Sequence, residues 1–370
     1  MTNLFIVFTP FQLFIAQQII QQENLSNNVL IQSYVKGYGY FLDIYNIMLM
    51  PNQWDKAIVF DDLILWDGTQ LHSYLDVKYV YNNYKKIKNI LKENNVGTIF
   101  MGEHQNRTLR FTAKVFSKLG YKIAFFEEGA AHYVKRYYNK PNLWTKIKIH
   151  VLDFVYYIPI YRIRFAKYRY IDNCPGDDIP IDIRYSVIPL YKEPFDKILH
   201  VQKLMSENVM RQIHNEVNSD DGKRILLMTD PMRELLPAKY LHLYFETIKE
   251  TVNDLKQTTI YLKFHPRDLP DTCEKIKKII QNSGLKYNVL CEKMSTNIPV
   301  EYYLQEFSFD TVYIFNASTY LYNGYIYPKV KFFNLLNVLN EKCKSAGATR
   351  LEDIERIIKA YNNYSINDKN

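Results

Sequence analysis

The chain has 370 residues, 47% of them hydrophobic and 23% charged, with only 12 glycines and 14 prolines. This composition excludes a disordered or collagen-like chain, and the length predicts two globular domains of ordinary size. The formal net charge of +8 favours an anionic partner such as a nucleotide, an acidic glycan or an anionic membrane surface, although a lysine-rich surface without such a partner explains it equally well.

The first half of the chain alternates apolar runs with helical stretches. An apolar run at 4–8 and a helix expected over 13–20 form a βα unit at the start of the chain. The other strands are expected at 29–34, 57–60, 98–101 and 122–126, and the other helices at 77–93 and 108–119. Because this alternation is typical of a parallel sheet, we assign residues 1–185 to an N-terminal α/β domain.

The second half repeats the alternation after a polar, turn-forming run at 218–222. Residues 186–222 are expected to be a linker region, and residues 223–345 a second α/β domain. Its strands are expected at 224–228, 259–264, 287–291, 311–315 and 331–333, and its helices at 240–252 and 273–282. An amphipathic helix at 351–361, within a C-terminal segment at 346–370, could pack on the N-terminal domain. Two such domains predict an α/β fold of the GT-B type, with two Rossmann-like domains that face a central cleft.

A segment at 137–171 is rich in tyrosine and basic residues. Basic segments with aromatic anchors can lie on an anionic bilayer, and a helical insertion packed on its own domain is the alternative. Nucleic acid is not expected as a partner, because no fold signature for it accompanies these residues. No apolar run reaches 18 residues, and the four cysteines form no Cys-x-x-Cys pair. A cytoplasmic protein, with peripheral association at the inner face of the cytoplasmic membrane as a further option, fits these features.

Two adjacent carboxylates follow the apolar run at 123–126. Glu127 and Glu128 precede Gly129, which lets the backbone turn or approach a ligand closely. In open α/β sheets, ligands bind beyond the carboxyl ends of the strands. One of the two acids is therefore a candidate general base.

A histidine between two cations follows the strand expected at 259–264. Lys263 and Arg267 flank His265, and Pro266 fixes the turn. An imidazole in this place can donate to an anionic leaving group or protonate it, and Lys263 could stabilise the same charge. A histidine that merely caps a turn is the alternative.

Hydroxyl and acidic side chains follow two further expected elements of the second domain. Ser318 and Thr319 come after the strand at 311–315, where the start of a helix would offer an anion site or need ordinary capping. Glu301 precedes a helical run at 302–306, where it could accept from ribose hydroxyls or simply suit the helix dipole.

Several common catalytic motifs are absent from the sequence. It contains no Asp-x-Asp, and no His/Asp/Glu cluster has metal-ligand spacing, so no metal is expected. It also lacks a Gly-x-Gly-x-x-Gly fingerprint, a Walker loop and a Gly-x-Ser-x-Gly elbow, which counts against dehydrogenases, P-loop enzymes and hydrolases.

Taken in chain order, the motifs FIVFTPFQL, FFEEG, YLKFHPRD, IPVE and FNAST resemble those of bacterial sialyltransferases of glycosyltransferase families 52 and 38. The resemblance spans roughly residues 4–320. It implies an inverting, metal-independent transfer of sialic acid from CMP-sialic acid to a hydroxyl of a galactoside or sialoside, without a cofactor. A bacterial surface glycan, either lipooligosaccharide or capsule, would be the acceptor. Single additions are favoured over polysialyl transfer by the small size of the chain.

The resemblance also assigns roles to individual residues, with the first domain on the acceptor side and the second on the nucleotide side. Glu128 would take the proton from the acceptor hydroxyl, and Glu127 would orient it or contact the acceptor. His265 would donate to, or protonate, the departing CMP phosphate. Ser318 and Thr319 would hold that phosphate.

Five further positions are expected at the donor, together with Lys263. Thr229, Asp230 and Glu301 would lie near the ribose and the base. Thr9 and Gln12, in the first loop, would face the sialyl group.

Two other functions remain open from the sequence. One is a different cytidine-nucleotide-dependent transferase, which would move Kdo or a polyol phosphate. The other is a non-catalytic peripheral scaffold of polysaccharide assembly, although a scaffold needs neither the strand-end acids nor His265. A homodimer is also compatible with the sequence.

Overall fold

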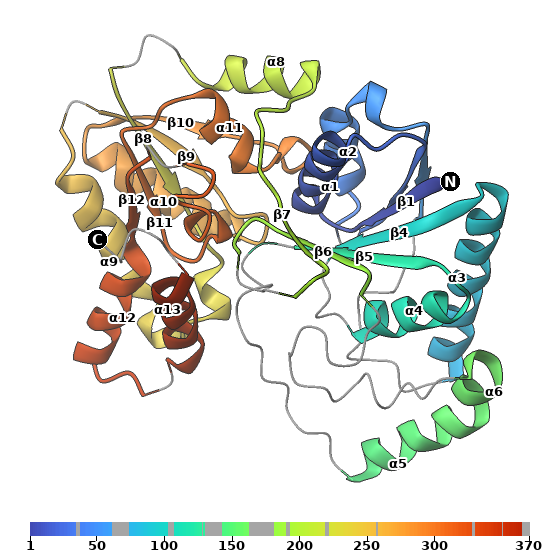
Figure 1. Ribbon diagram of the computed structural model, residues 1–370. Coiled ribbons are helices and arrows are strands. Elements are labelled where there is room, and N and C mark those ends of the chain that lie inside the picture. The colour runs from blue at the N-terminus through green and yellow to red at the C-terminus, as the bar shows by residue number, and fades with distance from the viewer. Residues whose placement is uncertain are drawn as a thin grey trace. The chain divides into compact units, whose positions relative to one another are not determined.

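The chain forms two α/β units, which divide between Gln202 and Lys203 (Figure 1). The computed structural model describes residues 1–34, 38–60, 74–102, 107–127, 129, 143–162, 181–189, 193–218, 222–256, 258–327, 330–349 and 351–364.

The first unit is built on a seven-stranded, wholly parallel sheet in the order β3-β2-β1-β4-β5-β6-β7. Its strands are β1 (Thr2–Val7), β2 (Asn28–Gln32), β3 (Lys56–Val59), β4 (Val96–Gly102), β5 (Lys122–Phe126), β6 (Ile183–Ser186) and β7 (Asp196–Ile198). The chain builds β2 and β3 on one side of β1 and then crosses to β4 on the other. The carboxyl ends of β1 and β4 are therefore a topological switch point, where such sheets bind ligands.

The helices of the first unit are α1 (Pro10–Glu23), α2 (Phe41–Met48), α3 (Tyr74–Glu93), α4 (Arg107–Lys118), α5 (Leu143–Leu152) and α6 (Ile158–Tyr161). A π-helical turn (Asp153–Tyr157) joins α5 to α6. Helix α1 begins where it does because Pro10 suits its first turn and the Thr9 hydroxyl accepts from the Gln12 amide at 3.2 Å.

The central strands of this unit read as continuous apolar runs because they are buried on both faces. Leu4, Phe5 and Ile6 are all fully buried in β1. The Phe5 ring stacks on Phe100 of β4 with 4.2 Å between ring centroids, directly across the β1–β4 pair. This packing holds together the two strands that flank the switch point.

The second unit has a five-stranded parallel sheet in the order β10-β9-β8-β11-β12. Its strands are β8 (Lys223–Met228), β9 (Thr258–Lys263), β10 (Lys286–Leu290), β11 (Thr311–Ile314) and β12 (Phe332–Asn334). Its helices are α8 (Glu207–Glu216), α9 (Leu241–Asn253), α10 (Pro270–Asn282), α11 (Val300–Glu306), α12 (Leu335–Ser345) and α13 (Glu352–Tyr364). The switch point of this sheet lies between β8 and β11.

The two parallel sheets confirm the expected fold class, a pair of Rossmann-like α/β units. The stretch expected as a linker is more structured than the sequence suggested, since it contains β7 and α8. The prediction of a helix that begins near Ser318 and Thr319 was wrong, because the chain makes only a 3₁₀ turn at Ser318–Tyr320. Helix α13, the expected C-terminal helix, packs against α12 of its own unit.

Replacement of Gly102 by alanine is expected to lower the free energy of unfolding by about 1 to 3 kcal/mol, the usual cost of overpacking. The added Cβ would lie 2.6 Å from Gln12 Nε2, and the Gln12 side chain is held by a 2.7 Å bond from the Phe8 amide to its Oε1. Denaturant unfolding followed by circular dichroism measures the change. Gly222→Ala, where an added Cβ meets no atom within 4 Å, is the control, and an equal loss in both variants would contradict the expectation.

Candidate active site

A buried carboxyl group links the two strands at the switch point of the second unit. Asp230 follows β8 and is only 3% exposed, and its Oδ2 accepts from the backbone amide of Asn316 at 2.7 Å. Asn316 follows β11, so this one hydrogen bond joins the loops that follow the two strands at the switch point. In doubly wound sheets, ligands usually bind at such a switch point.

A second group of bonds fixes the loop after β9 to the end of β8. The His265 amide lies 3.0 Å from the Thr229 hydroxyl oxygen and 2.9 Å from Asp268 Oδ2. The Thr229 hydroxyl also donates to Asp268 Oδ2. The strand-end residues Thr229 and His265 were predicted from the sequence and lie together, whereas Asp268 was missed. Its signal was present in YLKFHPRD, since aspartate often accepts from the free amides of a turn.

The imidazole of His265 is oriented by its own turn. The Arg267 amide donates to His265 Nδ1 at 3.0 Å, so the neutral ring carries its proton on Nε2. Burial, followed by the positive charges of Arg267 and Lys263, lowers the pKa of His265 to about 3. At neutral pH the ring is therefore an uncharged hydrogen-bond donor through Nε2.

Burial raises the pKa of the two acids predicted for this site, Asp230 and Glu301. Burial, and then the negative charge of Asp268, raises the pKa of Asp230 to about 8. Burial also raises the pKa of Glu301, whose Oε1 accepts from the Thr319 hydroxyl at 2.9 Å. Asp230 is thereby suited to contact a hydroxyl group of a ligand without a full negative charge, and Glu301 already contacts the hydroxyl group of Thr319.

The buried side chain of Lys263 is held by hydrogen bonds within the protein. Its Nζ lies 2.5 Å from Asn297 Oδ1 and 3.3 Å from the free thiol of Cys291. Cys291 is fixed in turn, because its amide donates to Glu216 Oε2 at 2.9 Å. Lys263 thus connects the end of β9 to the end of β10, and it acts on His265 and Glu301 through its charge.

Ser318 and Thr319 do not stand at the start of an α-helix, since only a 3₁₀ turn follows them. Thr319 is buried against Glu301, while Ser318 is partly exposed. Ser318 can offer its hydroxyl group to an anion, whereas the hydroxyl proton of Thr319 is donated to Glu301. The helix dipole expected from the sequence is missing.

The predicted residues of the first unit have structural contacts at its strand ends. Thr9 caps α1, and Gln12 is fully buried beside Gly102 with its Oε1 bonded to the Phe8 amide. Glu127 is also fully buried, and its Oε2 accepts from the Val187 amide at 2.9 Å, which ties β5 to the loop after β6. Roles of these residues at a donor or acceptor stay predictions.

Glu128, the expected base, lies outside the described residues. Among the residues that the structure describes, no group of three or more His, Cys, Asp or Glu side chains could hold a metal ion.

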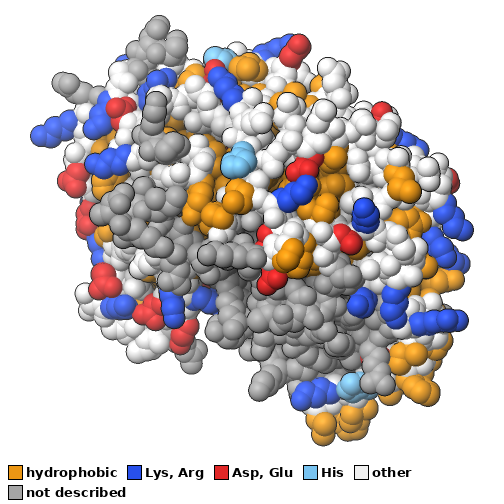
Figure 2. Space-filling model, in the orientation of Figure 1, with side chains coloured by type: hydrophobic (Ala, Val, Ile, Leu, Met, Phe, Trp, Pro, Cys, Tyr) orange, Lys and Arg blue, Asp and Glu red, His pale blue; other side chains and the backbone are white. Residues whose placement is uncertain are grey.

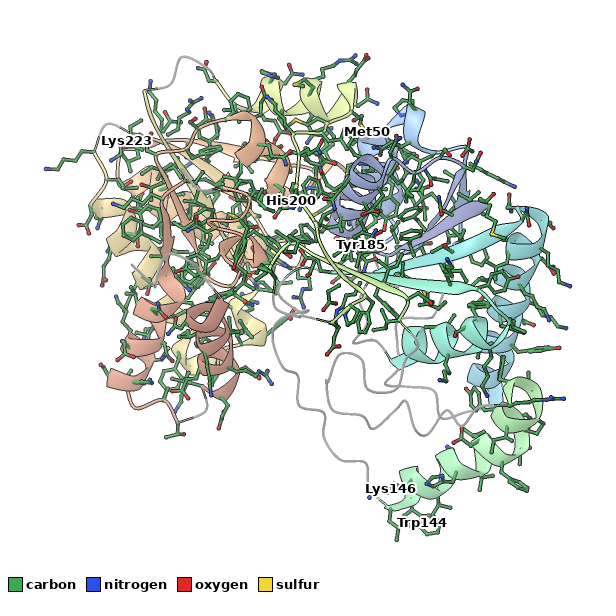
Figure 3. All side chains as sticks on the ribbon, viewed as in Figure 1. Met50, Trp144, Lys146, Tyr185, His200 and Lys223 are labelled. Carbon is green, nitrogen blue, oxygen red and sulfur yellow. The ribbon has the colours of Figure 1, made fainter. Side chains whose placement is uncertain are left out.

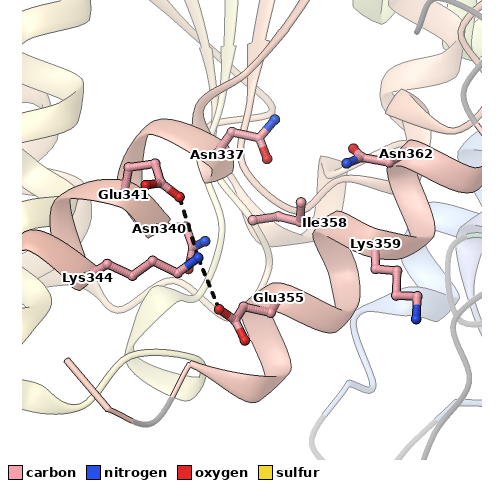
Figure 4. Close-up of a pocket in the computed structure, with 8 residues that line it drawn as sticks. All are labelled: Asn337, Asn340, Glu341, Lys344, Glu355, Ile358, Lys359 and Asn362. Atoms are coloured by element: carbon pink, nitrogen blue, oxygen red, sulfur yellow. Dashed lines mark ion pairs between the residues drawn. The ribbon is translucent and has the colours of Figure 1, made fainter. Parts of the chain in front are cut away.

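A separate hollow of about 610 Å³ lies between α12 and α13 (Figure 4). Lys344 crosses it, with its Nζ 3.5 Å from Glu341 Oε1 and 3.2 Å from Glu355 Oε1. None of the residues predicted for catalysis or donor binding lines this hollow. It is therefore not part of the candidate site.

The profile of the alpha-2,8-polysialyltransferase (POLYST) family matches residues 3–337 of the chain. The chain belongs to this family. The match covers nearly all of the first unit and the second unit up to residue 337, and it includes every predicted site residue, from Thr9 to Thr319. It confirms that the protein is a glycosyltransferase of the sialyltransferase type, which uses a nucleotide-sugar donor and a glycan acceptor. The resemblance to families 52 and 38 in particular stays a prediction.

Solved structures with a similar course of the chain include UDP-GlcNAc 2-epimerases from Methanocaldococcus jannaschii and Neisseria meningitidis. They are 15% and 10% identical, with a TM-score of 0.49 each. The alignments cover 97% of this chain and 91% of the first enzyme, and 99% and 96% for the second. A glycosyltransferase from Rickettsia africae is 12% identical, with coverages of 99% and 94% and a TM-score of 0.44. No curated protein sequence matches the chain significantly.

Asp230→Asn is expected to change how stability depends on pH. Because the pKa of Asp230 is raised to about 8 in the folded protein, the folded state keeps a proton that the unfolded chain releases near pH 4. Wild-type stability therefore falls between about pH 4 and pH 8, by up to roughly 1.4 kcal/mol per pH unit for this one proton. The asparagine variant lacks this titration and keeps an oxygen for the Asn316 amide.

Thermal midpoints at several pH values measure the effect. The midpoint of Asp230→Asn should rise relative to wild type as pH increases across this window. Asp254→Asn, on the surface of the same unit, controls for the loss of one carboxylate. Parallel pH profiles for wild type and Asp230→Asn would contradict the expectation.

Proposed function

We propose that this protein transfers sialic acid from CMP-sialic acid to a hydroxyl of a galactoside or sialoside on a bacterial surface glycan, with inversion and without a metal or cofactor. The observation that carries the proposal is the joined set of strand-end residues around His265, Thr229 and Asp230, in a chain whose family is named for sialyl transfer. The family name favours a sialoside acceptor, an α2,8 linkage and repeated addition over single additions to lipooligosaccharide.

The His265 loop suits the phosphate of the donor. An Nε2–H donor, fixed by the Arg267 amide on the other side of the ring, can bind a phosphate oxygen. An arriving phosphate anion would favour the charged imidazolium and so raise the pKa of His265 from its low value in the free protein. The same side chain could then stabilise, or protonate, the departing CMP.

The buried acids suit the neutral, hydroxyl-rich part of the nucleotide. Asp230 and Glu301 can accept from ribose hydroxyls when ionised and donate to them when protonated. Thr319 already donates to Glu301 and so fixes the direction of that carboxyl group. Ser318, which is partly exposed, is available for the phosphate.

The chemical step needs one base on the acceptor side. The acceptor oxygen attacks the anomeric carbon of the sialyl group as its proton passes to Glu128, and the bond to the CMP phosphate breaks with its electron pair on the phosphate oxygen. A single displacement of this kind inverts the anomeric centre. Glu127 supports the proposal indirectly, because its bond to the Val187 amide fixes the end of β5, directly before Glu128.

His265→Ala is expected to lower kcat/KM by about 10²- to 10³-fold, the usual cost of removing one donor to a developing negative charge. His242→Ala changes an exposed histidine of α9 and should leave transfer unchanged. Release of CMP in the presence of a sialylated oligosaccharide provides the rate. An unchanged rate for His265→Ala would remove this residue from the reaction.

Glu128→Gln should abolish transfer while CMP binding, measured by calorimetry, changes little, because a general base acts on the acceptor and not on the nucleotide. Glu193→Gln, which changes an exposed acid of the same unit, is the control and should leave transfer unchanged. Substantial transfer by Glu128→Gln would exclude it as the base.

The donor and the metal requirement are decided by one assay with EDTA present throughout. CMP-sialic acid with a sialoside or galactoside should give CMP and a longer glycan. Transfer from CMP-Kdo alone, or of a polyol phosphate from its cytidine nucleotide, would establish the other transferase function. No transfer from any cytidine donor would favour the scaffold.

A further inference from the structure

The helical segment 143–162 of the first unit carries an apolar stripe on its surface. Large hydrophobic side chains recur at intervals of three or four residues, the spacing that places them on one face of a helix. The exposed members of this stripe are Leu143 (71%), Trp144 (80%), Ile147 (45%), Val151 (55%), Phe154 (76%) and Val155 (50%). In a chain whose other large apolar side chains are mostly buried, an exposed stripe of this length indicates an interaction surface.

The C-terminal end of the same segment is anchored in the first unit. Tyr157 and Tyr161 are buried against Val115 of α4, and the Tyr161 ring meets the ring of Tyr84 of α3 edge-on at 5.2 Å. Lys118 of α4 closes the far end by donating from Nζ to the Arg162 carbonyl oxygen at 3.0 Å. The segment that carries the exposed stripe is therefore held at its C-terminal end by its own unit.

Positive charges border the stripe. Lys146, Lys148 and His150 are all exposed on α5. Lys148 lies one helical turn after Trp144, and His150 lies one turn before Phe154, so that cations stand on the surface beside the large apolar groups. Figure 2 shows blue and pale blue side chains among the orange ones at this end of the molecule, and Figure 3 shows Trp144 and Lys146 extending outward from the first turns of α5.

Negative charge is nearly absent from this segment. Its sequence contains one acid, Asp153, and that side chain is only 2% exposed. On α3, Lys85 is exposed as well, and its Nζ lies 4.3 Å from the centre of the Tyr81 ring. The surface around the stripe is thus both apolar and cationic.

We propose that the stripe of 143–155, with Lys146, Lys148 and His150, docks the protein on an anionic lipid bilayer. Helices that lie in the interface between water and lipid combine an apolar face with bordering cations, and tryptophan is enriched at that depth. A second copy of this chain fits less well, because pairing two such surfaces would bring their cations together. In the described part of the chain, no helix is both long and apolar enough to cross a bilayer, and docking of this kind requires none.

Flotation of the full-length protein with vesicles tests the proposal. Vesicles of phosphatidylcholine with phosphatidylglycerol should carry the protein, and vesicles of phosphatidylcholine alone should carry much less. High salt should weaken the binding, since it screens the attraction between Lys side chains and the lipid head groups. Equal binding to both kinds of vesicle, or to neither, would overturn the proposal.

Two pairs of substitutions separate the apolar from the electrostatic contribution. Trp144→Ala with Phe154→Ala, and Lys146→Glu with Lys148→Glu, should each weaken binding to anionic vesicles by roughly tenfold or more. The matched controls are Leu269→Ala with Val338→Ala and Lys249→Glu with Lys278→Glu, which change exposed side chains of the second unit. Circular dichroism spectra of all variants should equal that of wild type, because every substituted side chain is exposed.

Fluorescence provides a local readout. Trp144 emission should shift to the blue on addition of anionic vesicles, and Trp144→Phe should bind with little change but lose that shift. If the variants of the stripe bind vesicles as wild type does, but turn a dimer into a monomer in sedimentation, the stripe is an interface between copies and the proposal is wrong.

Discussion

The candidate donor site depends on the bond between the Asp230 carboxyl group and the Asn316 amide. Strands β8 and β11 are neighbours at the switch point of the sheet, where the connections that follow the two strands lead to opposite sides. The distance between the two loops is therefore set by contacts between them, and the Asp230–Asn316 bond is one such contact. The carboxyl group of Asp230 is buried, and its raised pKa is the cost of taking that group out of water. Thr229 directly precedes Asp230 at the end of β8, and its hydroxyl oxygen accepts from the His265 amide. The end of β8 therefore positions His265 as well.

The candidate site combines uncharged groups with one buried ammonium group. His265 is neutral at pH 7 in the free protein, and Asp230 is mostly protonated below about pH 8. The Lys263 ammonium is buried and bonded to Asn297 and Cys291, and its positive charge helps to lower the pKa of His265. Under the proposed function, a positive charge on the imidazole would form only together with the donor phosphate.

The sequence predicted the two parallel sheets well, because strands buried on both faces leave continuous apolar runs such as 4–8 and 122–126. It missed β6 (Ile183–Ser186) and β7 (Asp196–Ile198), which are too short and too polar to form such a run. His265 and Thr229 were found because polar residues directly after an apolar run mark a strand end. Asp268 was missed because its role depends on a turn that brings it back to the His265 amide, and the helix expected after Thr319 failed because tertiary contacts of that loop outweigh local helix preference.

Helix α13 reaches this site from the far end of the second unit. Its buried Tyr361 hydroxyl lies 3.0 Å from Asn316 Oδ1 and 3.2 Å from the Ala317 carbonyl oxygen. During synthesis, Asn316 leaves the ribosome well before Tyr361, so the loop after β11 lacks this support until α13 has been made and has packed on α12. The candidate donor site is therefore completed late in translation, and an unfinished chain can carry both sheets before the loop after β11 has this support.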